Sequence, residues 1–408
     1  MGQLVNMPFP SQKRQRILWM QVWGLALVQG AIALTWVIYN LYLVDLLTRF
    51  GLPKSWAVGL LVFENILAIL MEPLMGSLSD RLQRQVGSRF LLVALGSILS
   101  AGLFLAIPLL VTFGTEGVRW LLPAVLVAWA LAMTVFRSPA LSLLGQYAFA
   151  TQLPAAASIL TLVGGLAGAA GPLAGPFILG LGPVAAFSVG SAVLLVAAGV
   201  LRQTQPNQTL FAETTHLNGK QDSPRISPRQ LALAFGAGLG VTLGFRLMML
   251  MFPSVLSTRF PSTPTQWVIG LLFVTLAATA IPAGTLATRW GNAQAMFGGL
   301  IGMALFCALA AITPSLGIGV AVAIAFGAAF SLVSNGTIPF ALSMAPSDRH
   351  GLGTGMYFGG AALASSLFSG VAQRLTGQIF WMSLLGVLAF LVAAACVVMG
   401  SKIRGTAP

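Results

Sequence analysis

Four ionisable side chains stand inside long apolar runs of this 408-residue chain: Glu64, Glu72, Arg137 and Arg246. A charge inside a membrane-spanning helix costs at least about 2.5 kcal/mol, so such residues usually mark an ion or substrate path. Glu64 and Glu72 are eight residues apart, a rotation of roughly 80 degrees on a helix, so both can face one cavity. These side chains favour ion coupling, with the carboxylates as the coupling groups.

Arg137 lies in a neighbouring run at a depth comparable to Glu72, and we expect the two to form an ion pair. The pair can be a coupling site or a permanent staple between two helices. Arg246 has no acidic residue in the later spans to neutralise it. It must find backbone carbonyls, pair with Glu64, or bind an anionic substrate, and these alternatives stay open.

Three amides, Asn40, Asn65 and Asn335, could donate hydrogen bonds into a cavity near the membrane midplane. Each could equally be a tie between helices. Cys307 and Cys396 lie in different apolar runs, so the sequence indicates small packing residues there and no disulfide or metal site.

Composition places these residues in a membrane protein. Hydrophobic residues make up 57% of the chain, charged residues only 7%, and the mean hydropathy is +0.91. A bilayer-spanning helix needs about 20 apolar residues. In lipid, unpaired backbone N–H and C=O groups are too costly for any spanning structure other than helices and closed barrels. The alternation of apolar and polar residues that marks barrel strands is missing from this sequence. The sequence therefore predicts an all-α integral membrane protein with twelve transmembrane helices near residues 18–43, 57–78, 88–112, 120–146, 156–180, 183–201, 231–253, 266–287, 293–312, 315–344, 352–372 and 377–400.

Lysine and arginine are distributed unevenly between the two membrane sides. With the N-terminus placed inside, the inner loops carry 14 of the 21 basic residues: Lys13, Arg14, Arg16, Arg81, Arg84, Arg89, Arg202, Lys220, Arg225, Arg229, Arg289, Arg349, Lys402 and Arg404. The outer loops carry five: Arg49, Lys54, Arg119, Arg259 and Arg374. The positive-inside rule then places both termini in the cytoplasm. Topology and anionic lipid account for the net charge of +13, without a nucleic-acid partner.

One long polar segment, residues 202–230, divides the chain into six-helix halves at residues 1–201 and 231–408. Its lone histidine, His216, is interpreted as a bystander rather than a metal ligand. The chain has no Gly-rich phosphate loop, zinc-ligand spacing or nucleophile-plus-base arrangement, so we expect neither an enzyme nor a cofactor.

A hairpin motif, Pro73-Leu-Met-Gly76-Ser-Leu-Ser-Asp80-Arg81, ends the second run, and a basic segment closing at Arg89 leads into the third. A fainter copy, Gly284-Thr-Leu-Ala-Thr-Arg289, lies about half a chain later. Twelve spans with this hairpin in duplicate resemble the major facilitator superfamily, over nearly the whole chain. Further stretches resemble its branch of glycoside, pentoside and hexuronide:cation symporters and sucrose-type carriers: Tyr39-Asn40-Leu-Tyr42, Arg84-x-x-Gly87-Ser-Arg89, Arg137-Ser-Pro139 and Ala345-Pro346-x-x-Arg349-x-Gly351.

The resemblance implies a coupling role for Glu72, because the symporters of that branch carry a cation-coupling carboxylate just before Pro-x-Met-Gly. The branch has a second carboxylate one turn earlier, where this chain has Ala68, and an acidic residue near the position of Arg137. A sodium site needs several oxygen ligands, whereas a proton needs one carboxylate. Proton coupling is therefore expected, with the arginine holding Glu72 ionised until the pair separates.

The hairpin itself can act as a latch. Asp80 and Arg81 can pair with helix ends or with neighbouring charges in one conformation and lose those partners in the other. Gly76 permits close helix approach and Gly87 permits the turn. The second copy has Thr288 where the first has Asp80, so a latch should depend on the N-terminal half. The alternative is that these charges only anchor a loop at the headgroups.

The sequence thus predicts a secondary transporter of the plasma membrane that works as a monomer by alternating access. The first hypothesis is proton-coupled uptake of a small polar solute of sugar or glycoside type. Residues Arg246, Asn40 and Asn335 are the candidate substrate contacts. Export of an amphipathic compound by proton antiport is the second hypothesis, favoured by the glycines and prolines of residues 168–176. A membrane receptor or assembly factor that transports nothing is the third.

Overall fold

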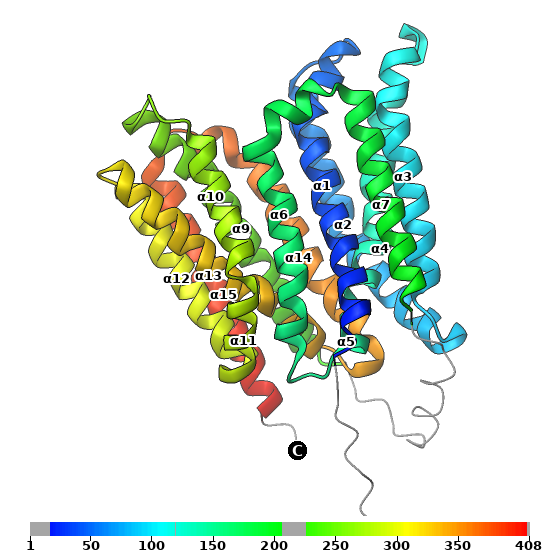
Figure 1. Cartoon of the computed structure of the whole chain (residues 1–408), viewed down its shortest axis with the longest axis vertical. Helices are drawn as coiled ribbons and strands as arrows, with labels where there is room; N and C mark the ends of the chain where they lie inside the picture. The colour runs from blue at the N-terminus through cyan, green and yellow to red at the C-terminus, as the bar shows by residue number, and fades with distance from the viewer. Residues whose placement is uncertain (1–16, 119, 206–225, 406–408) are drawn as a thin grey trace, which may run out of the picture.

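The computed structural model describes residues 17–118, 120–205 and 226–405, and within these ranges it contains helices and no strand (Figure 1). The long helices are α1 (Trp19–Arg49), α2 (Ser55–Val86), α3 (Phe90–Phe113), α4 (Leu121–Ser142), α6 (Leu153–Gly180), α7 (Pro183–Gln203), α9 (Pro228–Arg259), α12 (Asn292–Ile312), α13 (Leu316–Ser343), α14 (His350–Leu375) and α15 (Ile379–Gly405). Shorter elements are α5 (Leu144–Tyr147), α10 (Thr265–Ala278), α11 (Ala280–Trp290) and the 3-10 turns Glu116–Val118 and Ser347–Arg349.

The helices match the twelve predicted spans. Within the described ranges, ten are long and apolar enough to cross a membrane, and the pair α10 and α11, bent by 49° at Thr279, provides an eleventh. The remaining predicted span is α14, whose 26 residues include six glycines and several hydroxyl side chains. Its composition is more polar than that of the others because both of its sides are covered by protein. The predicted all-α membrane fold is confirmed.

Two hydrophobic cores hold the helices together. One is built by α1–α7 together with Ile338 and Leu342 of α13, and in it Phe104 stacks on Phe187 at 4.3 Å and on Trp129 at 5.0 Å between ring centres. The other is built by α9–α15 around Phe326 and Phe390. Apart from the two α13 residues, each core lies on one side of the predicted linker, although the domain boundaries themselves stay a prediction. Residues 206–225 of that linker, with His216, Lys220 and Arg225, lie outside the described ranges, as do Lys13, Arg14, Arg16 and Arg119.

Helices α6 and α14 lie in the middle of the molecule, where the helix group α1–α7 meets the helix group α9–α15 (Figure 1). Helix α14 packs against α2 on one side and α9 on the other, and α6 packs against α10, α11 and α13. Glycines allow the closest of these approaches. A Cβ added at Gly76 of α2 would overlap the backbone carbonyl of Gly351 in α14, and one at Gly360 of α14 would overlap that of Phe235 in α9.

Both ends of the described chain lie at the same end of the bundle. The start of α1 is bonded to α5 through the Leu18 N–H and the Tyr147 carbonyl, and α5 contacts the start of α14 where Gly145 meets His350. The α2–α3 hairpin and the end of α15 lie at this end too (Figure 1). We refer to it as the cytoplasmic end, following the predicted orientation.

Candidate functional site

Glu72 is fully buried in the middle of α2, where Arg137 and Ser138 of α4 both donate hydrogen bonds to its carboxylate. The predicted ion pair between Glu72 and Arg137 is therefore present. The arginine is the more accessible partner, and its guanidinium lies 4.8 Å from the centre of the Phe358 ring of α14. Ser138 was missed from the sequence as a partner, although it stands directly after Arg137.

The same carboxylate lies beside the contact between the two helix groups. A Cβ added at Gly355 of α14 would overlap the Glu72 carbonyl and come within 2.7 Å of the Pro73 Cα. Helix α14 thus touches the backbone of α2 at Glu72, while Phe358, one turn further along α14, covers the guanidinium. Any movement of α14 relative to α2 must change the surroundings of this ion pair.

Glu64 lies two turns away on α2 and is 4% exposed. Its Oε1 accepts a hydrogen bond of 2.6 Å from the Tyr39 hydroxyl of α1, and its Oε2 is sealed without a partner among the described residues. Tyr39 is packed against Trp129 of α4, with 4.6 Å between ring centres. Glu64 therefore bonds to α1 and Glu72 to α4, both within their own half. Tyr39 belongs to a motif noted in the sequence, but nothing there predicted its bond to Glu64.

Arg246 in α9 bonds to α14 instead of pairing with Glu64. Its Nε donates to the Ser365 hydroxyl at 3.0 Å, and its guanidinium carbon lies 5.8 Å from the centre of the Phe368 ring. The hypothesis of an ion pair with Glu64 is thus wrong for this conformation. The other two hypotheses, a bond to a backbone carbonyl and the binding of an anionic ligand, concern the two terminal nitrogens of the Arg246 guanidinium.

The three amides make mostly structural contacts. Asn40 is exposed and donates to the Trp36 carbonyl in its own helix, and Asn65 donates in the same way to Leu61. Asn335 is fully buried in α13 and donates to the Ala280 carbonyl at 2.7 Å, where α10 breaks from α11. Asn335 is therefore a tie between helices, the alternative that its sequence context allowed. The predicted substrate contacts of Asn40 and Asn335 stay predictions.

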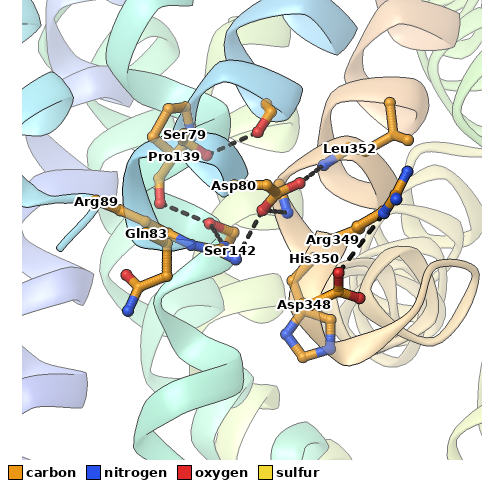
Figure 2. A network of polar contacts seen from close by, with 12 residues as sticks. Ser79, Asp80, Gln83, Arg89, Pro139, Ser142, Asp348, Arg349, His350 and Leu352 are labelled. Atoms are coloured by element: carbon orange, nitrogen blue, oxygen red, sulfur yellow. Dashed lines mark hydrogen bonds and ion pairs between the residues drawn. The ribbon is translucent and has the colours of Figure 1, made fainter. Parts of the chain in front are cut away.

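Asp80 joins the two helix groups at the cytoplasmic end (Figure 2). Its two carboxylate oxygens accept hydrogen bonds of 2.8 Å from the N–H groups of Gly351 and Leu352, the first turn of α14. This arrangement satisfies two orphan donors and places a negative charge at the positive end of a helix dipole. The predicted latch contact is thus present, made with a helix end.

Arg89 completes the network around Asp80. Its Nη2 lies 2.7 Å from Asp80 Oδ1, and its Nη1 donates to the Ser142 hydroxyl of α4 at 2.5 Å. Burial lowers the pKa of the Arg89 guanidinium, and the charge of Asp80 opposes that shift. Arg84, more exposed, lies 3.3 Å from Asp348 before α14. Arg81 is exposed and bonds to no described residue, so the helix end or neighbouring charge expected as its partner is not found in this conformation, and the ionic partner of Asp80 is Arg89.

The glycines of the hairpin take the predicted roles. Gly87 has φ of 75° and ends α2 in the left-handed conformation, which glycine adopts without strain. In the second copy, the Thr288 hydroxyl donates to the Gly284 carbonyl of its own helix, and Gly284 itself packs on Ser158 of α6. The second copy therefore provides close packing and no ionic contact through Thr288.

A cavity of about 1230 Å³ opens at the cytoplasmic end, between the α5–α6 segment of one half and α12 and α13 of the other. Its walls are mainly apolar and include Tyr147, Phe149, Trp290 and Phe340, with His350 at the start of α14. Asp80 and its partners do not line this cavity. Within the described ranges, no group of three or more histidine, cysteine or acidic side chains could hold a metal ion.

No protein-family model matches the chain, and no curated protein matches it in sequence. Solved structures do match it over nearly its whole length. The major facilitator superfamily proton:xylose symporter XylE, bound to 6-bromo-6-deoxy-D-glucose, aligns with a TM-score of 0.67 and 13% identity over 96% of both chains. A bacterial homologue of the iron transporter ferroportin, in an outward-facing state, aligns with 0.69 and 16% over 95% of this chain and 100% of its own.

The human organic anion transporter MFSD10 (TETRAN) aligns with a TM-score of 0.61 and 17% identity, over 92% of this chain and 98% of its own. None of the three is an enzyme. Identities this low establish the shared architecture and leave the substrate open. The chain has the major facilitator fold.

Proposed function

We propose that this protein is a secondary transporter that moves a small solute through the membrane by alternating access. In this mechanism, two six-helix halves, residues 1–201 and 231–408, rock about a central site. The proposal is supported by the shared fold and by cytoplasmic-end contacts that join the groups through a few hydrogen bonds. The protein works as a monomer, because one chain supplies both walls of the path, and both termini lie in the cytoplasm beneath the plasma membrane.

Transport is coupled to protons through Glu72. The observation that carries this is a fully buried carboxylate in a membrane span, held by Arg137 and Ser138 beside the contact with α14. While the pair is formed, the positive charge of the arginine and two donors stabilise the ionised carboxylate. Movement of α14 withdraws Phe358 and opens the guanidinium to water, which weakens the pair, and the carboxylate then takes a proton.

Glu64 serves as the second proton-binding group on the same path. Its free Oε2 can accept a proton while Tyr39 continues to donate to Oε1. Neither carboxylate has a second acidic side chain bonded to it among the described residues, and Ala68 occupies the turn between them. A sodium ion, which needs several oxygen ligands, is therefore a poor fit to this arrangement.

The latch at Asp80 sets which side is open. With its carboxylate on the α14 N-terminus, the α2–α14 contact is closed at the cytoplasmic end. Release of the two N–H groups lets that end separate and exposes the path to the cytoplasm. The first solute class is a small polar molecule of sugar or glycoside type, and the proton:xylose symporter shows that the fold can carry such a solute. The mainly apolar cavity favours the alternative, export of an amphipathic compound.

The test is proton movement in proteoliposomes loaded with a pH-sensitive dye, screened with disaccharides, glycosides and lipophilic cations. The variants are wild type, Glu72→Gln and the control Asp45→Asn, which makes the same chemical change in an exposed ion pair with Arg49. We expect a solute-dependent proton signal that only Glu72→Gln abolishes. Equal signals from all three would make Glu72 a structural staple, and ligand binding without any flux would favour a receptor or assembly factor.

A further inference from the structure

Arg246 is a positive charge without a counter-charge. It lies midway along α9, and the only acidic residue between positions 226 and 408 is Asp348, which is at the cytoplasmic end before α14. The two acidic residues inside spans of the other half are already engaged, Glu72 by Arg137 and Glu64 by Tyr39. A guanidinium without a compensating anion inside a membrane span is a costly group.

The bonding of Arg246 uses only part of its donor capacity. Nε donates to Ser365, which fixes the plane of the guanidinium, and the Phe368 ring lies against the same group. The two terminal nitrogens donate to no described residue, yet they are not among the buried atoms sealed from solvent. Four N–H donors in a rigid fork thus remain partly accessible and without a described partner inside the membrane span.

Contacts along α14 fix the depth of this fork. The Ser366 hydroxyl reaches the Val62 carbonyl of α2 at 3.5 Å, so Ser365 and its partner Arg246 lie near the level of Val62. Glu64 is two residues further along α2, which is a rise of about 3 Å. The fork and the proton-binding carboxylate are therefore at nearly the same depth, in different halves.

An aromatic ring lies beside the fork. The Phe368 ring of α14 is centred 5.8 Å from the guanidinium carbon and is only partly buried by the protein. A cationic fork next to a partly open aromatic face matches a ligand with an anionic group at one end and an apolar body at the other.

We propose that Arg246 binds the anionic group, a carboxylate or sulfonate, of an organic solute whose apolar body lies against the Phe368 ring. A planar guanidinium binds a carboxylate with two parallel hydrogen bonds, which the two open terminal nitrogens of Arg246 can supply. Ser365 acts as a positioning residue, because it holds Nε and so aims the other two nitrogens. This inference rests on the proposed transport function and favours its amphipathic alternative over the sugar or glycoside class, with an organic anion as the solute.

Binding of matched charged and neutral probes tests the inference. The full chain in nanodiscs is titrated with 2-naphthoate and with its neutral analogue 2-naphthamide, which has nearly the same shape. We expect naphthoate to bind wild type more tightly, and Arg246→Gln to lose on the order of 10- to 100-fold of that affinity with little change for naphthamide. Arg246→Lys keeps the charge but not the fork, so it should retain only part of the wild-type affinity for naphthoate.

The control is Arg374→Gln, which removes an exposed charge from the last turn of α14 and should change neither probe. Equal binding of naphthoate to wild type and Arg246→Gln, or no preference for naphthoate over naphthamide in wild type, would overturn the inference. Proton-coupled transport of a neutral solute that is unchanged in Arg246→Gln would also overturn the inference. The proposed transport function would stand in that case.

A second variant separates a ligand contact from an internal ion pair in the alternate conformation. If Arg246 serves only to pair with Glu64 in that state, Glu64→Gln should reproduce the Arg246→Gln defect, and the double variant should be no worse than either single one. Under the anion-binding inference, Glu64→Gln keeps the preference for naphthoate, because the fork remains intact. Loss of that preference in Glu64→Gln would contradict it.

Discussion

Removal of the charge of Asp80 should open the cytoplasmic end. Its carboxylate receives two hydrogen bonds that cross from α14 to α2, each 2.8 Å long. Hydrogen bonds to a charged group contribute about 1.5–3 kcal/mol each, and asparagine retains one neutral acceptor worth about 0.5–1.5 kcal/mol. The net loss for Asp80→Asn is about 3 kcal/mol, which shifts the closed-to-open equilibrium on the order of 100-fold.

The ion pair with Arg89 contributes differently. Both partners belong to the same half, so breaking the pair costs stability in the open and closed states alike and does not bias the latch. Leaving Arg89 buried without its partner should lower the free energy of unfolding by about 3–5 kcal/mol. The two effects can be told apart, because one appears in a conformational equilibrium and the other in denaturation.

Distances between spin labels measure the latch. Val86 at the end of α2 and Ser347 before α14 are exposed, whereas the native cysteines are buried, so Val86→Cys and Ser347→Cys can be labelled selectively. In wild type we expect one short distance, and in Asp80→Asn a predominant longer one. Asp45→Asn, in an exposed pair at the other end, is the control. A distance distribution in Asp80→Asn equal to that of wild type would refute the latch.

Two further substitutions test the contacts around α14 and Glu72. Gly76→Val should hold the cytoplasmic end apart, because its side chain would overlap the Gly351 carbonyl. The control is Gly59→Val on the same helix, whose side chain points into open space. The same pair of spin labels measures both variants, and a short distance in Gly76→Val would contradict the packing argument. Ser138→Ala removes one of two donors to the ionised Glu72. Its loss, about 1.5–3 kcal/mol, favours the protonated carboxylate, so the pH profile of proton-coupled flux should move upward by about one unit or more; an unchanged profile would show that Ser138 does not contact the coupling group.

Much of the fold could be predicted from the sequence, because each membrane span needs a long run of apolar residues. Runs of about 20 apolar residues predicted every long helix, and even α14, the most polar, stood out between the Arg349 segment and a second turn at Gly377. The break at Thr279 was not predicted, although Pro282 is a signal for it, because proline has no N–H for the Ala278 carbonyl and its ring clashes with that carbonyl. The bond from the Asn335 amide to the Ala280 carbonyl lies just after this break and ties it to α13.

The charged part of the site could be predicted because charged residues are scarce inside the spans. With only four ionisable groups inside spans, Glu72 and Arg137 had few other partners, and their pairing was confirmed. Hydroxyl groups are common in the chain, so Ser138 and Tyr39 could not be singled out without coordinates. Asp80 and Arg81 were both expected to contribute to the latch, but neighbours in a helix point in different directions, and of the two only Asp80 reaches the helix end of α14.

The polar character of α14 follows from its position. A helix that faces lipid on one side must be apolar there, and α14 instead contacts α2 through Gly351 and Gly355 and α9 through Gly360. Its first turn holds the Asp80 latch, Phe358 covers Arg137, and Ser365 aims Arg246. One rigid helix therefore contacts the latch, the proton-coupling pair and the anion fork. A movement of α14 that releases Asp80 must also displace Phe358 and Ser365, which is a physical route for coupling solute binding to proton release.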